Sequence, residues 1–192
     1  MQHFVRPLPV TSSASLGGDD DRSQRVIEME LVGVRVELPA NQPIVLLKER
    51  EGTRYLPIWI GAVEATAIAF ALQGVDTPRP LTHDLFVDVL EGLEIELVAV
   101  HVTDLRDGTF FAELQLMQGE KTFTVSARPS DAIALASRLE DVPILGTEAV
   151  LDEAGLEIED TEDGEDSGDP EEEVRQFRAF LDDVTPEDFK EE

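Results

Sequence analysis

Three apolar segments separated by short turn signals occupy the middle of the chain, and they restrict its fold more than any other feature. Apolar and polar residues alternate over residues 94–104, which is typical of a strand with one buried face. Asp107-Gly108 follows, and this dipeptide suits a two-residue hairpin loop because both of its positions take a positive φ. Residues 109–117 and 121–127 continue the pattern, with a glycine turn between them. The segment therefore predicts a three-stranded antiparallel meander.

Three more strands are predicted closer to the N-terminus. Residues 26–38 become strictly alternating in their second half, residues 44–47 are a short apolar run, and residues 55–60 form a third strand. Pro57 lies inside the last of these. Proline has no amide hydrogen to donate to a ladder, so we expect this strand to lie at a sheet edge or to be locally irregular.

Two helices are predicted between these two groups of strands. Residues 62–72 are rich in alanine, the best helix former, and Gly74 is placed to end the helix. Residues 83–90 form the second helix, with Thr82 as the expected N-cap. Asp84 lies in its first turn, where a negative charge suits the helix dipole.

A third helix and a last strand complete the expected order. Residues 132–139 have a helical pattern, with either Ser130 or Asp131 as the cap, and residues 142–145 form a short strand. Strands thus cluster in runs with the helices set apart, which is typical of an α+β fold. We predict a mixed, largely antiparallel sheet with three helices packed on it, followed by a disordered acidic tail.

Acidic residues are concentrated at the C-terminal end of the chain. Nineteen of the 42 acidic residues lie in residues 151–192, against three basic ones. A run of acidic residues and glycine cannot bury enough apolar area to offset the entropy of ordering it, so residues 156–170 are predicted to be a disordered linker. Residues 26–155 are expected to form the folded domain, and residues 1–25 a disordered leader.

Residues 171–192 differ from the linker before them. Four apolar residues recur at spacings of three and four, as in a narrow stripe along a helix: Val174, Phe177, Leu181 and Val184. We predict an amphipathic helical tail, in which residues 171–185 bind a protein partner. A separate hypothesis is that the acidic segment mimics nucleic acid and occupies a basic site of its own domain.

The composition excludes several classes of protein. Without cysteine the chain has no disulfides and no thiolate metal site, which fits a cytoplasmic location. No apolar run approaches the roughly 20 residues that span a bilayer, so no membrane partner is expected. Phosphate loops, dinucleotide fingerprints, serine elbows and HExxH motifs are all missing from the sequence. Residues 25–150 carry twenty acidic and ten basic residues, which argues against tight, static binding of nucleic acid.

Three stretches, in order along the chain, resemble the bifunctional nuclease family. They are Leu-Pro-Ile-Trp-Ile-Gly at residues 56–61, Arg-Pro-Leu-Thr-His-Asp-Leu at residues 79–85 together with residues 107–112, and Ala-Arg-Pro-Ser-Asp-Ala-Ile-Ala-Leu-Ala at residues 127–136. The resemblance covers about residues 27–150. It implies a mixed α+β fold, assembly into a homo-oligomer, and the nuclease activity on RNA and DNA that is attributed to plant members.

The second stretch contains a candidate acid–base pair. His83 and Asp84 lie at a predicted helix start, where an imidazole and a carboxylate can catalyse phosphodiester cleavage. The same residues have an equally weighted structural explanation, in which Asp84 only stabilises the helix and His83 only packs against the loop.

Two arginine-proline pairs are candidate phosphate contacts. Arg79 and Arg128 each precede a proline and a helix start, and together they can hold a phosphate. The slightly favoured alternative is structural, with each arginine paired to the aspartate of the other motif: Arg79 with Asp131, or Arg128 with Asp84.

Three carboxylates are candidate metal ligands. Glu64 stands among alanines on the first helix, where it is either exposed or paired with an arginine or a metal ion. Glu64, Asp84 and Asp131 together suit Mg²⁺ or Mn²⁺, which prefer oxygen ligands. His101, in a predicted strand, is expected to be an ordinary sheet residue.

Two functions follow from these observations. The first is a nuclease of low sequence specificity acting on phosphodiester bonds of RNA and DNA, assisted by Mg²⁺ or Mn²⁺. The alternative is a non-enzymatic oligomeric regulator or binding module, in which the arginine and aspartate motifs only hold the fold together.

Overall fold

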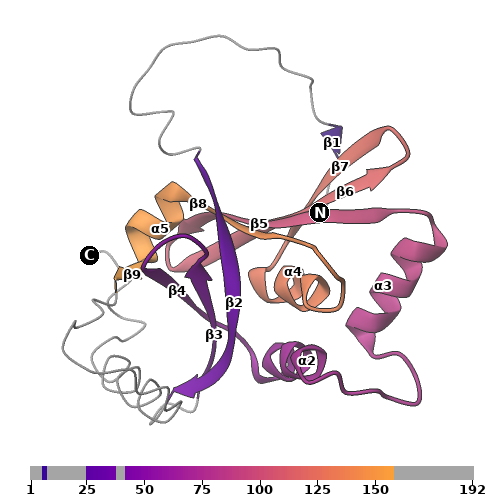
Figure 1. The fold of residues 1–192 in the computed structure, drawn as a ribbon, viewed down its shortest axis with the longest axis horizontal. Coiled ribbons are helices and arrows are strands. Elements are labelled where there is room, and N and C mark those ends of the chain that lie inside the picture. Colours follow the sequence, from indigo (N-terminus) through magenta and orange to yellow (C-terminus); the bar gives the residue numbers. More distant parts are fainter. Residues whose placement is uncertain (1–5, 8–24, 38–41, 158–192) are drawn as a thin grey trace.

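A computed structural model describes residues 6–7, 25–37 and 42–157 of the chain. Over these residues nine strands form one sheet in the order β1-β7-β6-β5-β8-β2-β3-β4-β9, and four helices accompany it (Figure 1). Every neighbouring pair is antiparallel except β5 and β8, which are parallel. The predicted α+β class, with a mixed and largely antiparallel sheet, is therefore confirmed.

The elements follow one another in the predicted order, with additions at both ends. Their bounds are β1 Arg6–Pro7, β2 Val26–Glu37, β3 Gln42–Glu49, β4 Arg54–Trp59, α2 Ala62–Leu72, α3 Thr82–Gly92, β5 Glu96–Arg106, β6 Thr109–Gln118, β7 Lys121–Ala127, α4 Pro129–Ala136, β8 Ile144–Thr147, α5 Glu148–Ala154 and β9 Leu156–Glu157.

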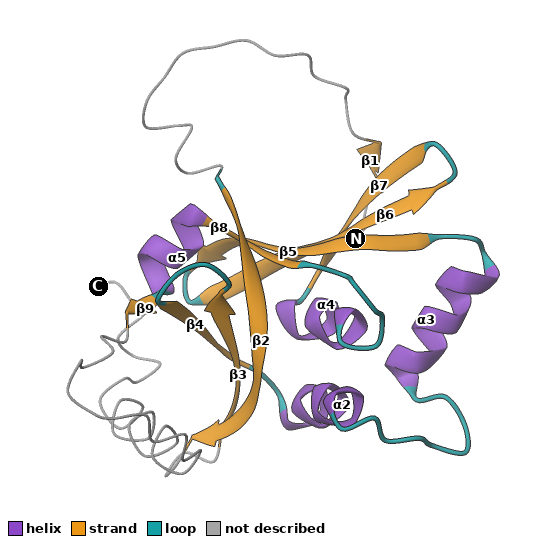
Figure 2. Cartoon of the chain, viewed as in Figure 1, coloured by secondary structure: helices purple, strands orange, loops and turns teal. Residues whose placement is uncertain are grey.

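The sheet is strongly twisted, as sheets of many strands are. In Figure 2, β2 and β3 run steeply across the view, whereas β5 runs close to horizontal. β8 joins the two sets, since it pairs with β5 on one side and β2 on the other. Helices α2, α3 and α4 gather on one side of the sheet, between the two sets of strands (Figure 2).

Helix α4 is the central helix of this layer. Seven of its eight residues are buried, and it contacts α2, α3, β5 and β6. Helix α3, by contrast, buries only Leu90 and leaves several large apolar residues exposed. The start of α4 is therefore held firmly among the other elements, and this start carries one of the predicted motifs.

The turn signals formed as expected. Asp107 and Gly108 have φ of 50° and 69° and join β5 to β6, and Gly74, with φ of 60°, follows the end of α2. The antiparallel meander β5-β6-β7 is confirmed. Pro57 lies beyond the short pairing of β4 with β9, so that side of β4 is open there, as expected for proline.

The predicted cap of α3 is wrong. The helix begins at Thr82, the capping position is Leu81, and no side chain caps it there. Instead the Asp84 carboxylate accepts a hydrogen bond from the Leu81 backbone N–H at 2.8 Å. An acid three residues into a helix can satisfy the capping amide in this way, which leaves the threonine hydroxyl without that role.

The predicted cap of α4 is also wrong. Arg128 occupies the capping position and Pro129 the first helical position, and neither Ser130 nor Asp131 caps the helix. Proline is favoured at this first position because its missing N–H would have had no partner. The carboxylate of Asp131 is taken up by Arg128 instead.

Helix α5 and strand β9 were not predicted from the sequence. The Thr147 hydroxyl accepts a hydrogen bond from the Val150 N–H at 3.3 Å at the start of α5. Leu156 and Glu157, which the sequence places in the acidic linker, pair with β4. The rest of that linker, the tail at 171–192, and the leader apart from Arg6–Pro7 and Arg25 lie outside the described residues. Within the described part, no helix has the length and apolar character needed to cross a membrane.

Candidate functional site

Polar side chains from three helix starts meet at the layer of α2, α3 and α4. Arg128 places Nη1 2.8 Å from Glu64 Oε1 of α2, and it holds the Asp131 carboxylate with Nε at 2.8 Å and Nη2 at 3.0 Å. Asp131 Oδ1 lies 3.3 Å from His83 Nε2 of α3. These four residues, Glu64, His83, Arg128 and Asp131, are called the helix-start cluster below.

The local sequence explains how each side chain reaches the cluster. Arg128 is extended, with φ of −73° and ψ of 146°, because the following proline disfavours a helical conformation before it. Asp131 lies three residues later and reaches back to it across the first turn. Glu64 folds back over Gly61, where an added Cβ would lie 2.2 Å from Glu64 Oε2. Glycine at the start of α2 thus leaves room for this carboxylate.

The cluster favours the ionised forms of Arg128 and Asp131. Burial alone would raise the pKa of Asp131, but hydrogen bonds from Arg128 and His83 outweigh it and lower that pKa. Hydrogen bonds to Asp131 and then to Glu64 raise the pKa of Arg128. Arg128 therefore stays charged, and Asp131 stays a carboxylate at neutral pH.

Asp84 faces a different partner from His83. Arg138, just beyond α4, donates from Nε to Asp84 Oδ1 at 2.5 Å and from Nη1 to the Ala134 carbonyl at 2.7 Å. The hydrogen bond from Arg138 lowers the pKa of Asp84, against the effect of burial. Adjacent helix residues point about 100° apart, because a turn takes 3.6 residues. His83 and Asp84 therefore do not face one another as a pair. His83 contacts Asp131, and Asp84 contacts Arg138.

The crosswise arginine–aspartate pairs are not formed. Arg128 binds the aspartate of its own motif, and the Arg79 side chain makes no ion pair with any residue that the structure describes. Two other contacts join the two motifs instead, His83 with Asp131 and Asp84 with Arg138. The general idea of two helix starts held together by polar contacts is right, but the predicted partners are wrong.

The candidate metal ligands do not converge. Across the described ranges, no group of three or more His, Asp or Glu side chains is arranged to hold a metal ion. Glu64 and Asp131 share Arg128, while Asp84 belongs to Arg138. The donors present therefore do not fit a site built from three protein carboxylates.

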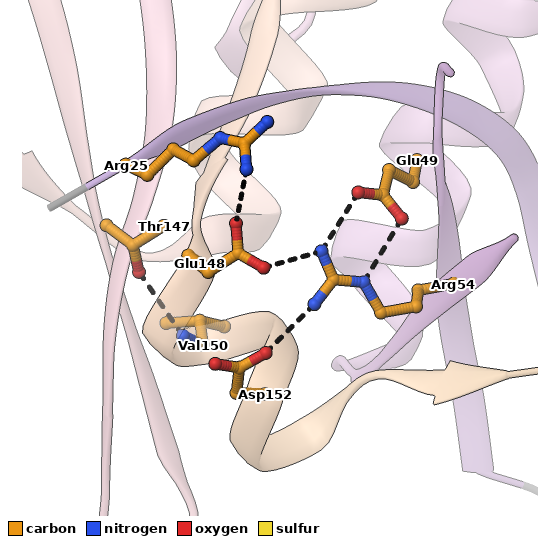
Figure 3. A network of polar contacts seen from close by, with 7 residues as sticks. All are labelled: Arg25, Glu49, Arg54, Thr147, Glu148, Val150 and Asp152. Carbon is orange, nitrogen blue, oxygen red and sulfur yellow. Dashed lines mark hydrogen bonds and ion pairs between the residues drawn. The ribbon is translucent and has the colours of Figure 1, made fainter. Parts of the chain in front are cut away.

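A second polar network, which sequence reasoning missed, surrounds Arg54 (Figure 3). Arg54 binds Glu49 from Nε at 3.1 Å and from Nη2 at 2.9 Å, Glu148 from Nη2 at 3.0 Å, and Asp152 from Nη1 at 3.0 Å. Glu148 is 5% exposed. The contacts join β3 and β4 to α5, and Arg54 and Glu148 are 94 positions apart in the sequence. No local pattern signals a pairing over that separation, and the network is well suited to anchor α5.

His101 lies in β5, as predicted, but its environment is unusual. Its Nε2 is buried and has no hydrogen-bond partner among the described residues. Burial lowers the pKa of His101. His101 belongs to a strand, whereas the helix-start cluster is built from residues at helix starts. His101 takes no part in that cluster.

Fold and cluster together define a compact α+β domain whose polar centre is built from the starts of three helices. The model of the bifunctional nuclease domain matches residues 45–159. This match covers more than half of the chain, and the chain belongs to the bifunctional nuclease domain family.

Relatives of two kinds share this domain. An uncharacterized protein of Mycobacterium tuberculosis is 52% identical over 164 residues, which cover 85% of this chain and 98% of that protein. Bifunctional nuclease 2 of Arabidopsis thaliana is 30% identical over 146 residues, 74% of this chain but 44% of the plant protein. Bifunctional nuclease 1 of the same plant is 30% identical over 129 residues, 65% of this chain and 39% of that protein.

Proposed function

We propose that this protein hydrolyses phosphodiester bonds of RNA and DNA with little sequence preference. The observation that carries the proposal is membership in the bifunctional nuclease domain family, together with similarity to two plant proteins named bifunctional nucleases. The helix-start cluster is the part of the described structure with the side chains that such a reaction needs.

In this proposal His83 is the general acid and base. Asp131 orients the ring by accepting a hydrogen bond from Nε2–H, which leaves Nδ1 able to accept a proton. The side chain of His83 is 15% exposed, so it is held in place while part of it remains open to solvent. Asp84 positions α3 through Arg138 and Leu81, in place of the catalytic role that the sequence suggested.

Arg79 and Arg128 are the proposed phosphate contacts. Arg79 is exposed, and its charge is not neutralised by any described side chain. A guanidinium has five N–H groups. Glu64 and Asp131 engage three of those of Arg128. Two N–H groups remain to contact a phosphate, and the Arg128 side chain is 64% exposed. The start of α3 also favours a nearby anion.

Assistance by Mg²⁺ or Mn²⁺ would require a metal site that the substrate helps to complete. The described carboxylates do not form a three-ligand set. Mg²⁺ is, however, often held by one or two carboxylates together with phosphates of the substrate. Cleavage is therefore measured both with and without a divalent metal ion.

The test is cleavage of labelled single-stranded RNA and duplex DNA by the full chain, with Mg²⁺, with Mn²⁺ and with EDTA. Substituting His83→Gln should reduce kcat by at least about 100-fold, the usual contribution of acid–base catalysis. Arg79→Gln should mainly raise KM, by about tenfold, because it removes a charged contact to phosphate. The matched control is Arg35→Gln, an exposed arginine on β2 whose loss should change neither constant.

Two results would reject the assignment. If the His83→Gln protein cleaves as fast as the wild type, His83 is not the acid–base group. If purified wild type shows no cleavage above that of a reaction without protein under any metal condition, the nuclease proposal fails for this chain.

A second candidate, a homo-oligomeric binding module, is supported by the exposed face of α3. Leu85, Phe86 and Val89 are 55%, 45% and 48% exposed, and apolar side chains gathered on one helix are typical of a subunit contact. Light scattering on the full chain and on a Leu85→Gln/Val89→Gln variant tests this. A multimer that the substitution dissociates supports the module, and a monomeric wild type argues against it.

A further inference from the structure

A groove of about 440 Å³ lies at the far end of α3 from the helix-start cluster. It is formed by the last turns of α3, the first residues of β5 and the loop after α4. Its apolar lining residues are Val87, Leu90, Ile95, Leu97, Val98, Leu139 and Val142. His83 and Glu91 are separated by eight positions of the helix, which is about 12 Å along its axis. The groove is therefore distinct from the proposed catalytic region.

Five carboxylates also line the groove, and none of the described lining residues is basic: Glu91, Glu94, Glu96, Glu140 and Asp141. None of the five forms an ion pair with a described residue. Like charges that line one groove repel one another, and a cation bound among them would reduce that repulsion. The electrostatics of the groove are thus complementary to a cationic occupant.

The backbone on both sides of the groove is held in an unusual conformation. Glu94 and Asp141 have φ of 55° and 60°, the left-handed region in which glycine or asparagine is more easily accommodated. Both side chains belong to the lining.

The groove also offers a strand edge that no described strand pairs with. β5 pairs with β8 only from Val100 to Val102, so β8 does not cover the beginning of β5. Val98, in this part of β5, is 41% exposed and lines the groove. An extended peptide can bind beside such an edge through backbone hydrogen bonds, while alternate side chains enter the groove.

We propose that this groove binds an extended segment of a partner protein in which apolar residues alternate with lysine or arginine. The apolar side chains would lie on the lining, and the basic ones would face the five carboxylates. The acidic C-terminal region of this chain, with nineteen acidic against three basic residues in 151–192, has the wrong charge to be the occupant. Nucleic acid is repelled for the same reason.

The experiment measures binding of a short fluorescein-labelled peptide of alternating leucine and lysine to the full chain by fluorescence anisotropy, at low and moderate salt. The groove variant is Glu94→Gln/Glu96→Gln/Glu140→Gln. The matched control, Glu51→Gln/Glu120→Gln/Glu153→Gln, removes the same charge at exposed acids outside the groove lining. Circular dichroism checks that each variant is folded.

The groove variant should bind about tenfold more weakly, since each exposed charge pair contributes a fraction of a kcal/mol, and the control should change binding by less than about twofold. Val98→Ser, which removes apolar surface from the exposed part of the lining, should weaken binding several-fold. Equal losses in the two triple variants would overturn the proposal, because binding would then be due to diffuse negative charge. A peptide of alternating serine and lysine that binds equally well would also overturn it, since the apolar lining would then have no part.

Discussion

Asp131 is the residue on which the helix-start cluster depends. It accepts two hydrogen bonds from Arg128 and lies within 3.3 Å of His83 Nε2. The sequence singled it out as a helix cap or a metal ligand. It does not cap α4, and among the described residues it belongs to no group of three or more side chains that could hold a metal ion. Its spacing from Arg128 was visible in the sequence, whereas its contact with a histidine 48 positions away was not.

We predict that Asp131→Asn destabilises the protein at neutral pH by about 1 kcal/mol, because it removes the charge that Arg128 and His83 bind at a partly exposed site. The folded-state pKa of Asp131 is lowered, so its contribution is present above the unfolded-state pKa and is lost as pH falls through the folded-state value. Urea unfolding at pH 7 and near pH 3 measures both effects. The difference between wild type and variant should shrink at the lower pH, and Asp88→Asn, at an exposed acid of α3, should change stability little.

His101 provides a second test at this scale. Burial lowers its pKa from an ordinary value of 6.5, so the unfolded chain takes up a proton before the folded chain does as pH falls. Stability of the wild type should therefore decrease between about pH 7 and pH 5. In His101→Phe, which also removes the unpaired buried nitrogen, that part of the decrease should vanish. An unchanged pH slope between those values would show that His101 does not titrate in this way.

At the scale of elements, signals contained within a few residues were predicted well. Helix α2 and strand β7 have the predicted bounds, and the Asp107-Gly108 hairpin formed. The caps of α3 and α4 were predicted wrongly, because both helices begin earlier than predicted, at Thr82 and Pro129, so that the capping positions fall on Leu81 and Arg128. Helix α5 was missed because it is short and its main polar anchor, Arg54, lies far away in the sequence.

The anchoring of α5 leads to a prediction about Arg54. Its side chain is 17% exposed, and removing it leaves Glu49 and Glu148, 16% and 7% exposed, without their main cation. Breaking a buried pair by deleting one partner typically costs about 3 kcal/mol. Arg54→Ala should therefore lower the free energy of unfolding by about that amount, as measured in urea.

The matched control for this prediction is Arg50→Ala. Among the described residues Arg50 pairs only with Glu28, and both side chains are largely exposed at 63% and 45%. An exposed pair of this kind contributes less than about 1 kcal/mol. A comparable loss in both variants would mean that the Arg54 network has no special role in holding α5.

At the scale of the whole molecule, net charge opposes the proposed substrate. The chain carries a formal charge of −27 at pH 7. Residues 158–192 hold sixteen acidic and three basic residues, or −13 of this total. Deleting them should raise affinity for single-stranded RNA by about tenfold at low salt, because long-range repulsion weakens, and the gain should disappear as salt rises. Fluorescence anisotropy over a salt series measures this, and no change at low salt would dismiss a role of the acidic segment in nucleic-acid binding.

The sequence by itself determined the class of fold, the meander of β5, β6 and β7, the alanine-rich helix, and the two motifs that meet at the helix starts. These features depend on alternation, turn dipeptides and helix propensity, which act between residues close together in the chain. The tertiary structure alone decided that β8 lies between β5 and β2, that Arg54 anchors α5, and that Asp131 rather than Asp84 faces His83. Each of these three features brings together residues that are tens of positions apart in the sequence. A charged side chain pairs with the opposite charge that the packed elements place within a few ångströms of it.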